Sequence, residues 1–360
     1  MKAAVLREVG KPLQIEDVQI SKPGPREVLI RTKASGLCHS DLHFMEGLWP
    51  HPLPTVLGHE AAGVVEQVGS EVTLVKPGDH VITCLSAFCG HCEFCLTDRM
   101  SLCLSPETKR KADEPTRLTQ NGAAMTQYLN LSGFAEQMLV HEHACVAIRK
   151  DMPFDRAALI GCGVMTGVGA AILTAKVRPG DTVAVIGLGG VGLSAVNGAA
   201  IAGAARIIAV DMSPGKANLA MAFGATDFVC AAEDDPVKTV LEMTKGGVDQ
   251  SFECVGLTKT VEQAFGMIKR GGATNVVGMV ALGQNISLPG SAFMGGKTIR
   301  GSAMGSNRFP LDMPKLVDMY MVGKLKLDDM VSRRIRLDQV NEGFAEMKGG
   351  QIARSVIVFD

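Results

Sequence analysis

Residues 183–192 read VAVIGLGGVG, and this stretch decides the fold of the second half of the chain. An apolar run, typical of a buried strand, leads into the pattern G-x-G-x-x-G formed by Gly187, Gly189 and Gly192. The first glycine permits a tight turn, the second lets the backbone approach a pyrophosphate, and the third lets helix and strand pack closely. Because backbone amides at the start of the next helix attract phosphate, the stretch predicts a dinucleotide site.

An acidic residue at the right distance supports this interpretation. The run IIAVD ends at Asp211, about 20 residues after the glycines, where a ribose-binding acid is expected. A carboxylate there accepts hydrogen bonds from both ribose hydroxyls and repels the 2′-phosphate of NADP. The sequence therefore predicts NAD as the cofactor.

Apolar runs and Ala-rich helical stretches alternate between residues 164 and 303. This rhythm indicates repeated βαβ units, and so a doubly wound parallel sheet of the Rossmann type. The expected strands are 183–187, 207–211, 248–253 and 273–278, and the clearest helices are 193–202 and 216–223.

Residues 1–163 have a different texture, with short β-like runs separated by Gly and Pro. Examples are 28–32, 63–68 and 80–83, which predict a mainly antiparallel, barrel-like domain. Residues 105–130 are polar and irregular, and we expect a long surface loop there. The tail, 304–360, is expected to return to the first domain with helices at 314–322 and 339–348 and a closing strand at 355–359.

Composition limits the class of protein. The 360 residues include 36 basic and 37 acidic ones, a balance that gives no sign of a nucleic-acid partner. We expect no membrane-spanning run of about 20 apolar residues and see no signal peptide, so a cytoplasmic location is predicted. In that setting the ten cysteines are expected to be metal ligands or buried thiols.

Four cysteines, Cys89, Cys92, Cys95 and Cys103, follow the spacing C-x2-C-x2-C-x7-C. Four thiolates satisfy tetrahedral zinc and leave no open position, which is typical of a structural site. An iron–sulfur cluster is the main alternative, and a redox pair or chance clustering are others. No Pro follows the last cysteine, and zinc is the favoured ligand.

Three more candidate ligands are scattered along the chain: Cys38 in GLCHSDLH, His59 in GHEAAG and Cys162 in GCGVMTG. Each is weak alone, because a single Cys or His is more often a buried, satisfied residue. Each is also flanked by glycine, which permits sharp turns. Two thiolates and one imidazole would leave zinc a fourth position for water or substrate, as in a catalytic site.

With these motifs in order, the whole chain resembles the zinc-dependent medium-chain alcohol dehydrogenases. GHEAAGVVEQVG, from Gly58 to Gly69, is similar to their zinc signature. The animal and plant branch, which includes glutathione-dependent formaldehyde dehydrogenases, is the most similar. The resemblance implies a GroES-like catalytic domain before the Rossmann domain.

The resemblance also implies roles for residues around the catalytic zinc. Glu60 matches an acid that approaches the metal, and Asp41 matches the carboxylate that orients the ligand histidine. Ser40 and His43 match a relay that carries the alcohol proton through the cofactor ribose to the surface. As alternatives, Ser40 could cap a helix near Asp41, His43 could be an exposed helix residue, and Glu60 could be structural.

Further positions match cofactor contacts in the family. His39 and Arg354 match residues at the pyrophosphate, although a solvated surface charge is the alternative for both. Lys216 matches a residue near the adenosine ribose. The remaining matches, at the glycine turn and around the nicotinamide, are Thr166, Gly190, Val191, Val255 and Val277.

The substrate is the least determined feature. By resemblance the pocket includes Trp49, Leu85, Met279 and Ala303, with Val277 beside them. This apolar lining favours a bulky, aromatic or terpenoid primary alcohol.

Three other expectations stay open. S-(hydroxymethyl)glutathione is the alternative substrate, although Glu107 stands where that subclass has an Arg that reads glutathione. A non-catalytic dinucleotide-binding protein or a zinc-free reductase is the alternative from another class. We expect a homodimer joined near residues 292–300 and no nucleic-acid or membrane partner.

Overall fold

The computed structural model describes residues 1–111, 113–349 and 354–360, and these form two compact units. The first unit contains Met1–Cys162, Arg308–Gly323 and Met330–Asp360. The second contains Gly163–Asn307 and Lys324–Asp329. The short return segment Lys324–Asp329 contacts the rest of the second unit through the Lys326 amide, which donates to Asn197 Oδ1 at 3.0 Å.

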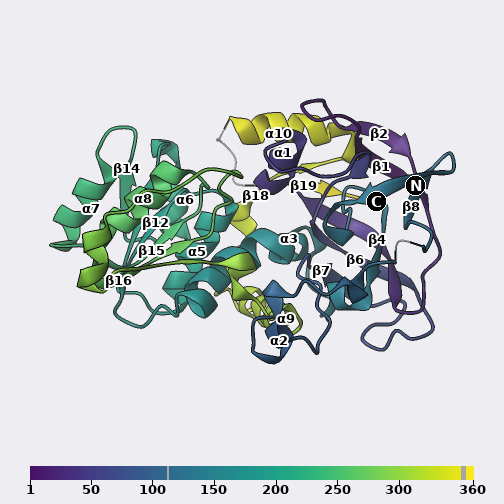
Figure 1. The fold of residues 1–360 in the computed structure, drawn as a ribbon, viewed down its shortest axis with the longest axis horizontal. Helices are drawn as coiled ribbons and strands as arrows, with labels where there is room; N and C mark the ends of the chain where they lie inside the picture. The colour runs from purple at the N-terminus through teal and green to yellow at the C-terminus, as the bar shows by residue number, and fades with distance from the viewer. Residues whose placement is uncertain (112, 350–353) are drawn as a thin grey trace. The chain divides into compact units, whose positions relative to one another are not determined.

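The first unit is built on two β-sheets, and it is the mainly antiparallel domain expected from the sequence (Figure 1). Its strands are β1 (Lys2–Leu6), β2 (Gln14–Asp17), β3 (Gln19–Ile20), β4 (Glu27–Gly36), β5 (Thr55–Val56), β6 (Glu60–Val68), β7 (His80–Thr83), β8 (Leu118–Gln120), β9 (Ala123–Gln127), β10 (Gln137–His141), β11 (Cys145–Ile148), β18 (Val331–Ile335) and β19 (Arg354–Val358). One sheet has the order β2-β1-β5-β9-β8-β3, and the other has β11-β7-β6-β4-β19-β18 with β10 added beside β4. Among the described strands of this first unit, only the pairs β5–β9 and β18–β19 are parallel.

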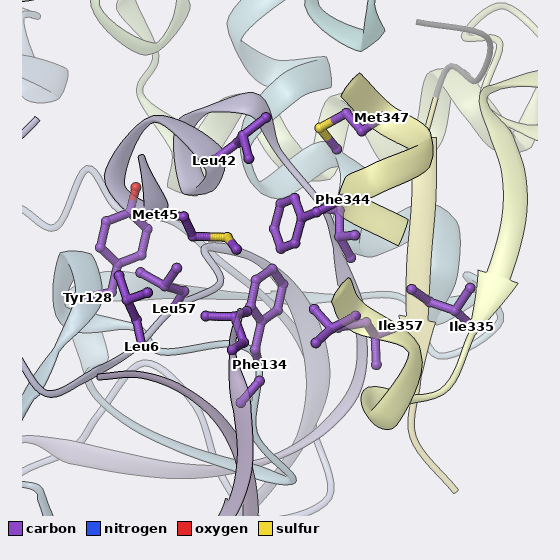
Figure 2. Packing of buried hydrophobic residues seen from close by; sticks show 14 residues of the cluster. Leu6, Leu42, Met45, Leu57, Tyr128, Phe134, Ile335, Phe344, Met347 and Ile357 are labelled. Atoms are coloured by element: carbon purple, nitrogen blue, oxygen red, sulfur yellow. The ribbon is translucent and has the colours of Figure 1, made fainter. Parts of the chain in front are cut away.

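Helices of the first unit cover the sheets and carry functional positions. They are α1 (His39–Met45), α2 (Glu93–Leu96), α3 (Phe154–Leu159), α9 (Phe309–Met321) and α10 (Val340–Lys348). Helix α1 and helix α10 pack their apolar faces into one cluster that also contains Leu57, Tyr128 and Phe134. Figure 2 shows this cluster, with Phe344 of α10 facing Met45 of α1.

The second unit is a six-stranded sheet in which every described pair of neighbouring strands is parallel. Its strands are β12 (Thr182–Ile186), β13 (Arg206–Asp211), β14 (Asp227–Cys230), β15 (Val248–Glu253), β16 (Ile268–Val276) and β17 (Thr298–Gly301). The order β14-β13-β12-β15-β16-β17 is the doubly wound order in which the chain reverses direction beside its first strand. The predicted Rossmann fold is therefore confirmed.

Helices connect these parallel strands, because a parallel pair needs a crossover. They are α5 (Gly190–Ile201), α6 (Ala217–Ala222), α7 (Pro236–Thr244) and α8 (Thr258–Met267), and α4 (Met165–Gly169) precedes the first strand of the sheet. Helix α5 starts three residues before the expected point because the helix begins inside the glycine pattern, at Gly190.

Two expectations from the sequence are wrong. The segment 105–130 is not one irregular loop: β8 and β9 form a hairpin across Asn121 and Gly122, which both have positive φ. The tail helix α9 begins at Phe309 and not at Pro314, because Pro310 stands in its first turn and Pro314 lies inside it.

A third expectation, that no apolar run is long enough to span a membrane, is also corrected. The helical stretch Phe154–Thr174 has 21 residues and a mean hydropathy of 1.9. Burial accounts for it, because 83% of its most apolar window lies inside the protein. It combines α3 and α4 with π-helical turns at Ile160–Val164 and Ala170–Thr174.

Candidate functional site

The four predicted thiols of the first metal site lie together in the structure. Sulfur–sulfur distances are 3.5 Å for Cys92–Cys95, 3.8 Å for Cys92–Cys103, 3.8 Å for Cys89–Cys103 and 3.9 Å for Cys89–Cys95. Zinc–thiolate bonds of about 2.3 Å at tetrahedral angles place sulfurs about 3.8 Å apart. The cluster therefore has the dimensions of a closed four-thiolate zinc site.

Local backbone shape brings these thiols together. Gly90 has a φ of 91° and Asp98 a φ of 62°, so the chain turns sharply on both sides of α2. Backbone amides point at the sulfurs: the Cys92 amide donates to Cys89 Sγ at 3.3 Å, and the Cys89 amide donates to Cys103 Sγ at 3.4 Å. Such donors stabilise thiolates, which are the forms that bind metal.

The three scattered ligands of the second site also converge. Ligand atoms of Cys38, His59, Glu60 and Cys162 all lie within 4.8 Å of one another, and all four residues are buried. Cys38 precedes α1, His59 precedes β6, and Cys162 lies in the π-helical turn Ile160–Val164. Because His59 and Glu60 are adjacent in the sequence, three segments of the chain supply all four residues of the cluster.

Asp41 organises this second cluster through three hydrogen bonds. Its Oδ1 lies 3.2 Å from His59 Nδ1 and accepts from the Gly58 amide at 3.0 Å. Its Oδ2 accepts from the Cys38 amide at 3.2 Å. One buried carboxylate thus holds the backbone at one ligand and the ring of another, and it fixes which ring nitrogen of His59 faces the cluster.

Electrostatics in the cluster favour the thiolate of one cysteine. The hydrogen bond with Cys162 holds the pKa of Cys38 well below its usual value, although burial opposes this, and His59 and Arg354 add to the effect. Burial disfavours the charged form of His59, yet Asp41 and the Cys38 sulfur raise its pKa well above the usual value. The same coupling raises the pKa of Cys162 well above its usual value, so without a metal one thiolate lies between a neutral thiol and a charged imidazole.

Glu60 completes the cluster from the first residue of β6. Burial raises the pKa of its carboxyl to about 8, against the attraction of Arg354. The Arg354 Nη2 atom lies 3.4 Å from Glu60 Oε1, and both side chains are buried. The structure therefore places Arg354 beside Glu60, while its expected contact with a pyrophosphate remains a prediction.

The second cluster fits a zinc ion by its donor set. His59 Nε2 is buried and has no hydrogen-bond partner among the described residues, although the opposite ring nitrogen is held by Asp41. A buried ring nitrogen without a partner is unfavourable unless something binds it. Two thiolate sulfurs and this nitrogen are the ligands of a three-residue zinc site, with a fourth position open to substrate.

The expected relay residues lie on α1 beside the cluster. Cys38 Sγ is 3.7 Å from Ser40 Oγ. Ser40 is the second residue of the helix and not its cap, because Cys38 occupies the cap position. His43, one turn further along, is half-buried, and its Nδ1 has no partner in the described chain. His39 is exposed at the first position of the helix.

The glycine turn of the second unit has the shape that a dinucleotide site needs. Gly187 has a φ of 89°, and a Cβ at Gly192 would overlap the Gly187 carbonyl oxygen. A Cβ at Gly189 would meet no atom within 4 Å, so open space lies beside this residue. Helix α5 begins directly after it, at Gly190 and Val191, and directs its first amides outward from the turn.

Asp211 ends β13 beside this turn. Its Oδ2 accepts from the Leu188 amide at 2.7 Å and from Lys216 Nζ at 3.1 Å, and its Oδ1 accepts from the Ser213 amide at 3.0 Å. These donors fix the carboxylate beside the glycine turn. Lys216 is paired with the carboxylate in this arrangement, so its charge is already balanced.

The other predicted contacts are divided between the units. In the second unit Thr166 Oγ1 donates to Met304 Sδ at 3.4 Å, and Val255 and Val277 follow the ends of β15 and β16. Trp49 and Leu85 belong to the first unit, whereas Met279 and Ala303 belong to the second. Their joint role in a substrate pocket remains a prediction.

Sequence reasoning missed two buried polar residues. Glu253 Oε1, at the end of β15, accepts from the amides of Val255 and Gly256 and from Thr260 Oγ1 at 2.7–2.8 Å, and so it fixes the turn after this strand. Tyr128 is fully buried, and its ring and that of His59 make a T-shaped contact with centroids 5.7 Å apart. The acid at a strand end was visible in the sequence, but nothing there distinguished Tyr128.

Two family models match the chain. The model described as alcohol dehydrogenase GroES-like domain matches residues 24–150. The model described as zinc-binding dehydrogenase matches residues 190–320.

Full-length relatives agree with these matches. The alcohol dehydrogenase class-3 of Myxine glutinosa is 42% identical and covers 99% of this chain and 97% of its own length. The S-(hydroxymethyl)glutathione dehydrogenase of Escherichia coli O139:H28 is 41% identical and covers 99% of both chains.

Two solved structures with a similar fold carry alcohol dehydrogenase names. The alcohol dehydrogenase zinc-binding domain protein of Burkholderia ambifaria superposes with a TM-score of 0.95 at 36% identity, over 100% of this chain and 98% of the other. The benzyl alcohol dehydrogenase of Acinetobacter calcoaceticus has a TM-score of 0.94 at 32% identity, over 100% and 99%.

Proposed function

The chain belongs to the zinc-dependent medium-chain alcohol dehydrogenase family and is an NAD-dependent oxidoreductase, and on this premise we propose that it interconverts a primary alcohol and its aldehyde at Cys38, His59 and Cys162. The convergence of these three ligand atoms within 4.8 Å carries the proposal. A zinc-free reductase or a non-catalytic nucleotide-binding protein would have no need for this cluster.

When bound, zinc supplies a Lewis acid at the substrate oxygen, and NAD supplies the hydride acceptor. The protein's own residues provide position and proton transfer. Asp41 keeps His59 Nδ1 engaged, so that Nε2 remains available to the metal. Ser40 Oγ, 3.7 Å from Cys38 Sγ, accepts the alcohol proton as it releases its own hydroxyl proton toward His43 on the same helix face, and His43 delivers a proton to solvent.

S-(hydroxymethyl)glutathione is the substrate candidate that the comparisons favour. Relatives with 41–42% identity over nearly the whole chain carry the names class-3 alcohol dehydrogenase and S-(hydroxymethyl)glutathione dehydrogenase. Because the whole framework is shared, the adduct of glutathione with formaldehyde is the first substrate to test.

A bulky or aromatic primary alcohol is the second candidate, favoured by two side chains. Glu107 lies on the four-thiol lobe, with its Oε2 2.8 Å from His91 Nε2, so this surface presents a carboxylate where a glutathione carboxylate would need a cation. Trp49 adds a large apolar ring. The structural similarity to a benzyl alcohol dehydrogenase supports the same candidate.

Rates of NADH formation distinguish the two candidates. The zinc-loaded protein is assayed with formaldehyde plus glutathione, with formaldehyde alone, with ethanol and with benzyl alcohol. The first candidate predicts the highest kcat/KM for the adduct, and the second predicts it for benzyl alcohol. In the second case Glu107→Arg should raise the adduct's kcat/KM, with Glu93→Arg on the same lobe as the matched control.

The proposal also includes a cellular compartment and an oligomeric state. A reducing, cytoplasmic compartment suits ten cysteines that are all free thiols. A homodimer joined through the edge strand β17 is supported by the exposed Phe293 and Met294 just before it. Sedimentation should then give twice the chain mass of 38.0 kDa, whereas a single-chain mass would exclude the dimer.

A further inference from the structure

Glu253 is the last residue of β15, and its side chain is completely buried. Its Oε1 atom accepts three hydrogen bonds, from the Val255 amide at 2.8 Å, the Gly256 amide at 2.7 Å and Thr260 Oγ1 at 2.7 Å. Backbone amides that leave a sheet need a new acceptor, and one oxygen supplies it for two of them. The side chain therefore sets the shape of the turn 254–256.

Glu253 also holds the turn 277–279, which follows β16. Its backbone carbonyl accepts from the amides of Val277 and Gly278, each at 2.9 Å. The two turns are in close contact, because a Cβ at Gly278 would overlap the Gly256 amide nitrogen and would lie 2.7 Å from Glu253 Oε2. One residue thus links two neighbouring turns at the carboxyl edge of the parallel sheet.

The turn 254–256 lies against the glycine turn of the dinucleotide site. A Cβ at Gly187 would lie 2.5 Å from Val255 Cγ2 and 3.3 Å from the carbonyl carbon of Cys254. This contact follows from the sheet order, because β15 is the direct neighbour of β12. A shift of the turn 254–256 would therefore alter the surface beside the glycine turn.

The order of the strands assigns these turns to one half of the cofactor. A doubly wound sheet binds a dinucleotide across the point where the strand order reverses, with one mononucleotide on each side. Asp211 ends β13, on one side of β12, where the adenosine ribose is expected. Strands β15 and β16 lie on the other side of β12. The turns that Glu253 holds are thus on the side of the nicotinamide and its ribose.

We propose that Glu253 is a positioning residue, which holds the turns 254–256 and 277–279 in the shape that receives the nicotinamide half of NAD. The proposal rests on the NAD-linked function proposed above, and not on the identity of the alcohol. The reach of the side chain matters more than its charge, because a single oxygen accepts all three hydrogen bonds. An acid that only stabilised the fold would not affect one half of the cofactor more than the other.

Two conservative variants separate reach from charge. Glu253→Gln keeps an oxygen at the same distance from the backbone and removes the charge, whereas Glu253→Asp keeps the charge and shortens the side chain. Asp249→Ala is the matched control, because Asp249 lies in the same strand and its Oδ2 accepts from the Thr182 amide at 3.0 Å. That bond lies at the opposite edge of the sheet, where β12 begins.

The affinities of each protein for NADH, NAD and ADP are measured by titration, and the free energy of unfolding is measured in urea. ADP carries the adenosine and both phosphates but lacks the nicotinamide and its ribose. Glu253→Asp should bind NADH and NAD about tenfold more weakly, the usual effect of one hydrogen bond, and ADP as well as the wild type does. Glu253→Gln should bind all three as the wild type does. Asp249→Ala should lose stability and keep every affinity.

Three results would overturn the proposal. They are an unchanged NADH affinity in Glu253→Asp, an equal loss for NADH and ADP, and a loss in Glu253→Gln as large as that in Glu253→Asp. Should Glu253→Asp fail to fold, Thr260→Val removes one of the three donors and should give the same selective loss in weaker form. An unchanged NADH affinity in that variant would then exclude the role.

Failure of the proposed function gives a different pattern. A wild type that binds NADH but oxidises no alcohol would refute the proposed function and leave the binding comparison intact. A wild type that binds neither NAD nor NADH would overturn both.

Discussion

His59 Nδ1 lies 3.2 Å from Asp41 Oδ1, and the opposite ring nitrogen of His59 is buried without a partner among the described residues. The two residues are separated by 18 positions in the sequence, and both are almost completely inaccessible to solvent. This contact orients the imidazole before any metal arrives. It also links α1 to the residue just before β6.

Replacing Asp41 with Asn should therefore weaken metal binding. An amide keeps the size of the side chain but loses the charge that holds the ring and one of the acceptors that fix the backbone. Zinc affinity, measured by competition with a chelator, should fall about 10- to 100-fold at the second site. The four-thiol site should keep its affinity, and an unchanged affinity at both sites would contradict this role.

The glycine turn gives a prediction with an internal control. Gly192→Ala places a methyl group against the Gly187 carbonyl and should destabilise the protein by about 1–3 kcal/mol. Gly189→Ala meets open space, so its stability without cofactor should be unchanged. Its NAD affinity should nevertheless fall at least about tenfold, because the methyl group occupies the path of the pyrophosphate. Unfolding curves and NAD titrations measure the two effects. Equal stability of the two variants would refute the assignment of close packing to Gly192 and of cofactor approach to Gly189.

Asp211 should decide between NAD and NADP. In Asp211→Asn the repulsion of a 2′-phosphate is removed, and Lys216 loses its partner and becomes free to pair with that phosphate. The ratio of kcat/KM for NAD to that for NADP should fall about 100-fold. Adding Lys216→Ala to the variant should restore part of the preference. A ratio that does not change with Asp211→Asn would exclude this residue as the determinant.

His141 should make the protein sensitive to mild acid. Burial, with repulsion from His143 and Arg26, lowers its pKa from 6.5 to about 4. Above pH about 6.5 the His141 ring is neutral in both the folded and the unfolded protein, so its titration does not change the free energy of unfolding. Between about 6.5 and about 4 the unfolded chain takes up the proton first, so folding stability falls by on the order of 2 kcal/mol.

The variant His141→Asn tests this expectation. Asparagine can still accept from the His143 amide, as His141 Nδ1 does at 3.0 Å, but it does not titrate. Urea unfolding of both proteins across this pH range should show a smaller loss of stability for the variant. Parallel curves would mean that His141 does not contribute to the acid sensitivity.

Strands and helices of the second unit were predictable because apolar runs and glycines act locally there. The run that ends at Asp211 and the turn at Gly187 need only neighbouring residues to form. The segment 105–130 could not be predicted in the same way. Its hairpin is stabilised by distant partners, such as Glu27, which accepts from both Arg110 and Arg117.

The metal clusters show the same contrast. The spacing of four cysteines within a stretch of 15 residues is enough to predict the structural metal site. Cys38, His59 and Cys162 could be grouped only by resemblance, because their meeting depends on the pairing of distant strands and on a π-helical turn. Tyr128 had no signal in the sequence, since its unpaired hydroxyl becomes visible only when the core around it is packed.

Metal content per chain tests the central claim most directly. Elemental analysis of the purified protein should give two zinc ions per chain. His59→Ala should retain one, with its four-thiol lobe and its NAD binding intact, and Cys230→Ala, a buried cysteine outside both clusters, should retain two. One zinc or none in the wild type, or two in His59→Ala, would contradict the assignment of a catalytic metal to this cluster.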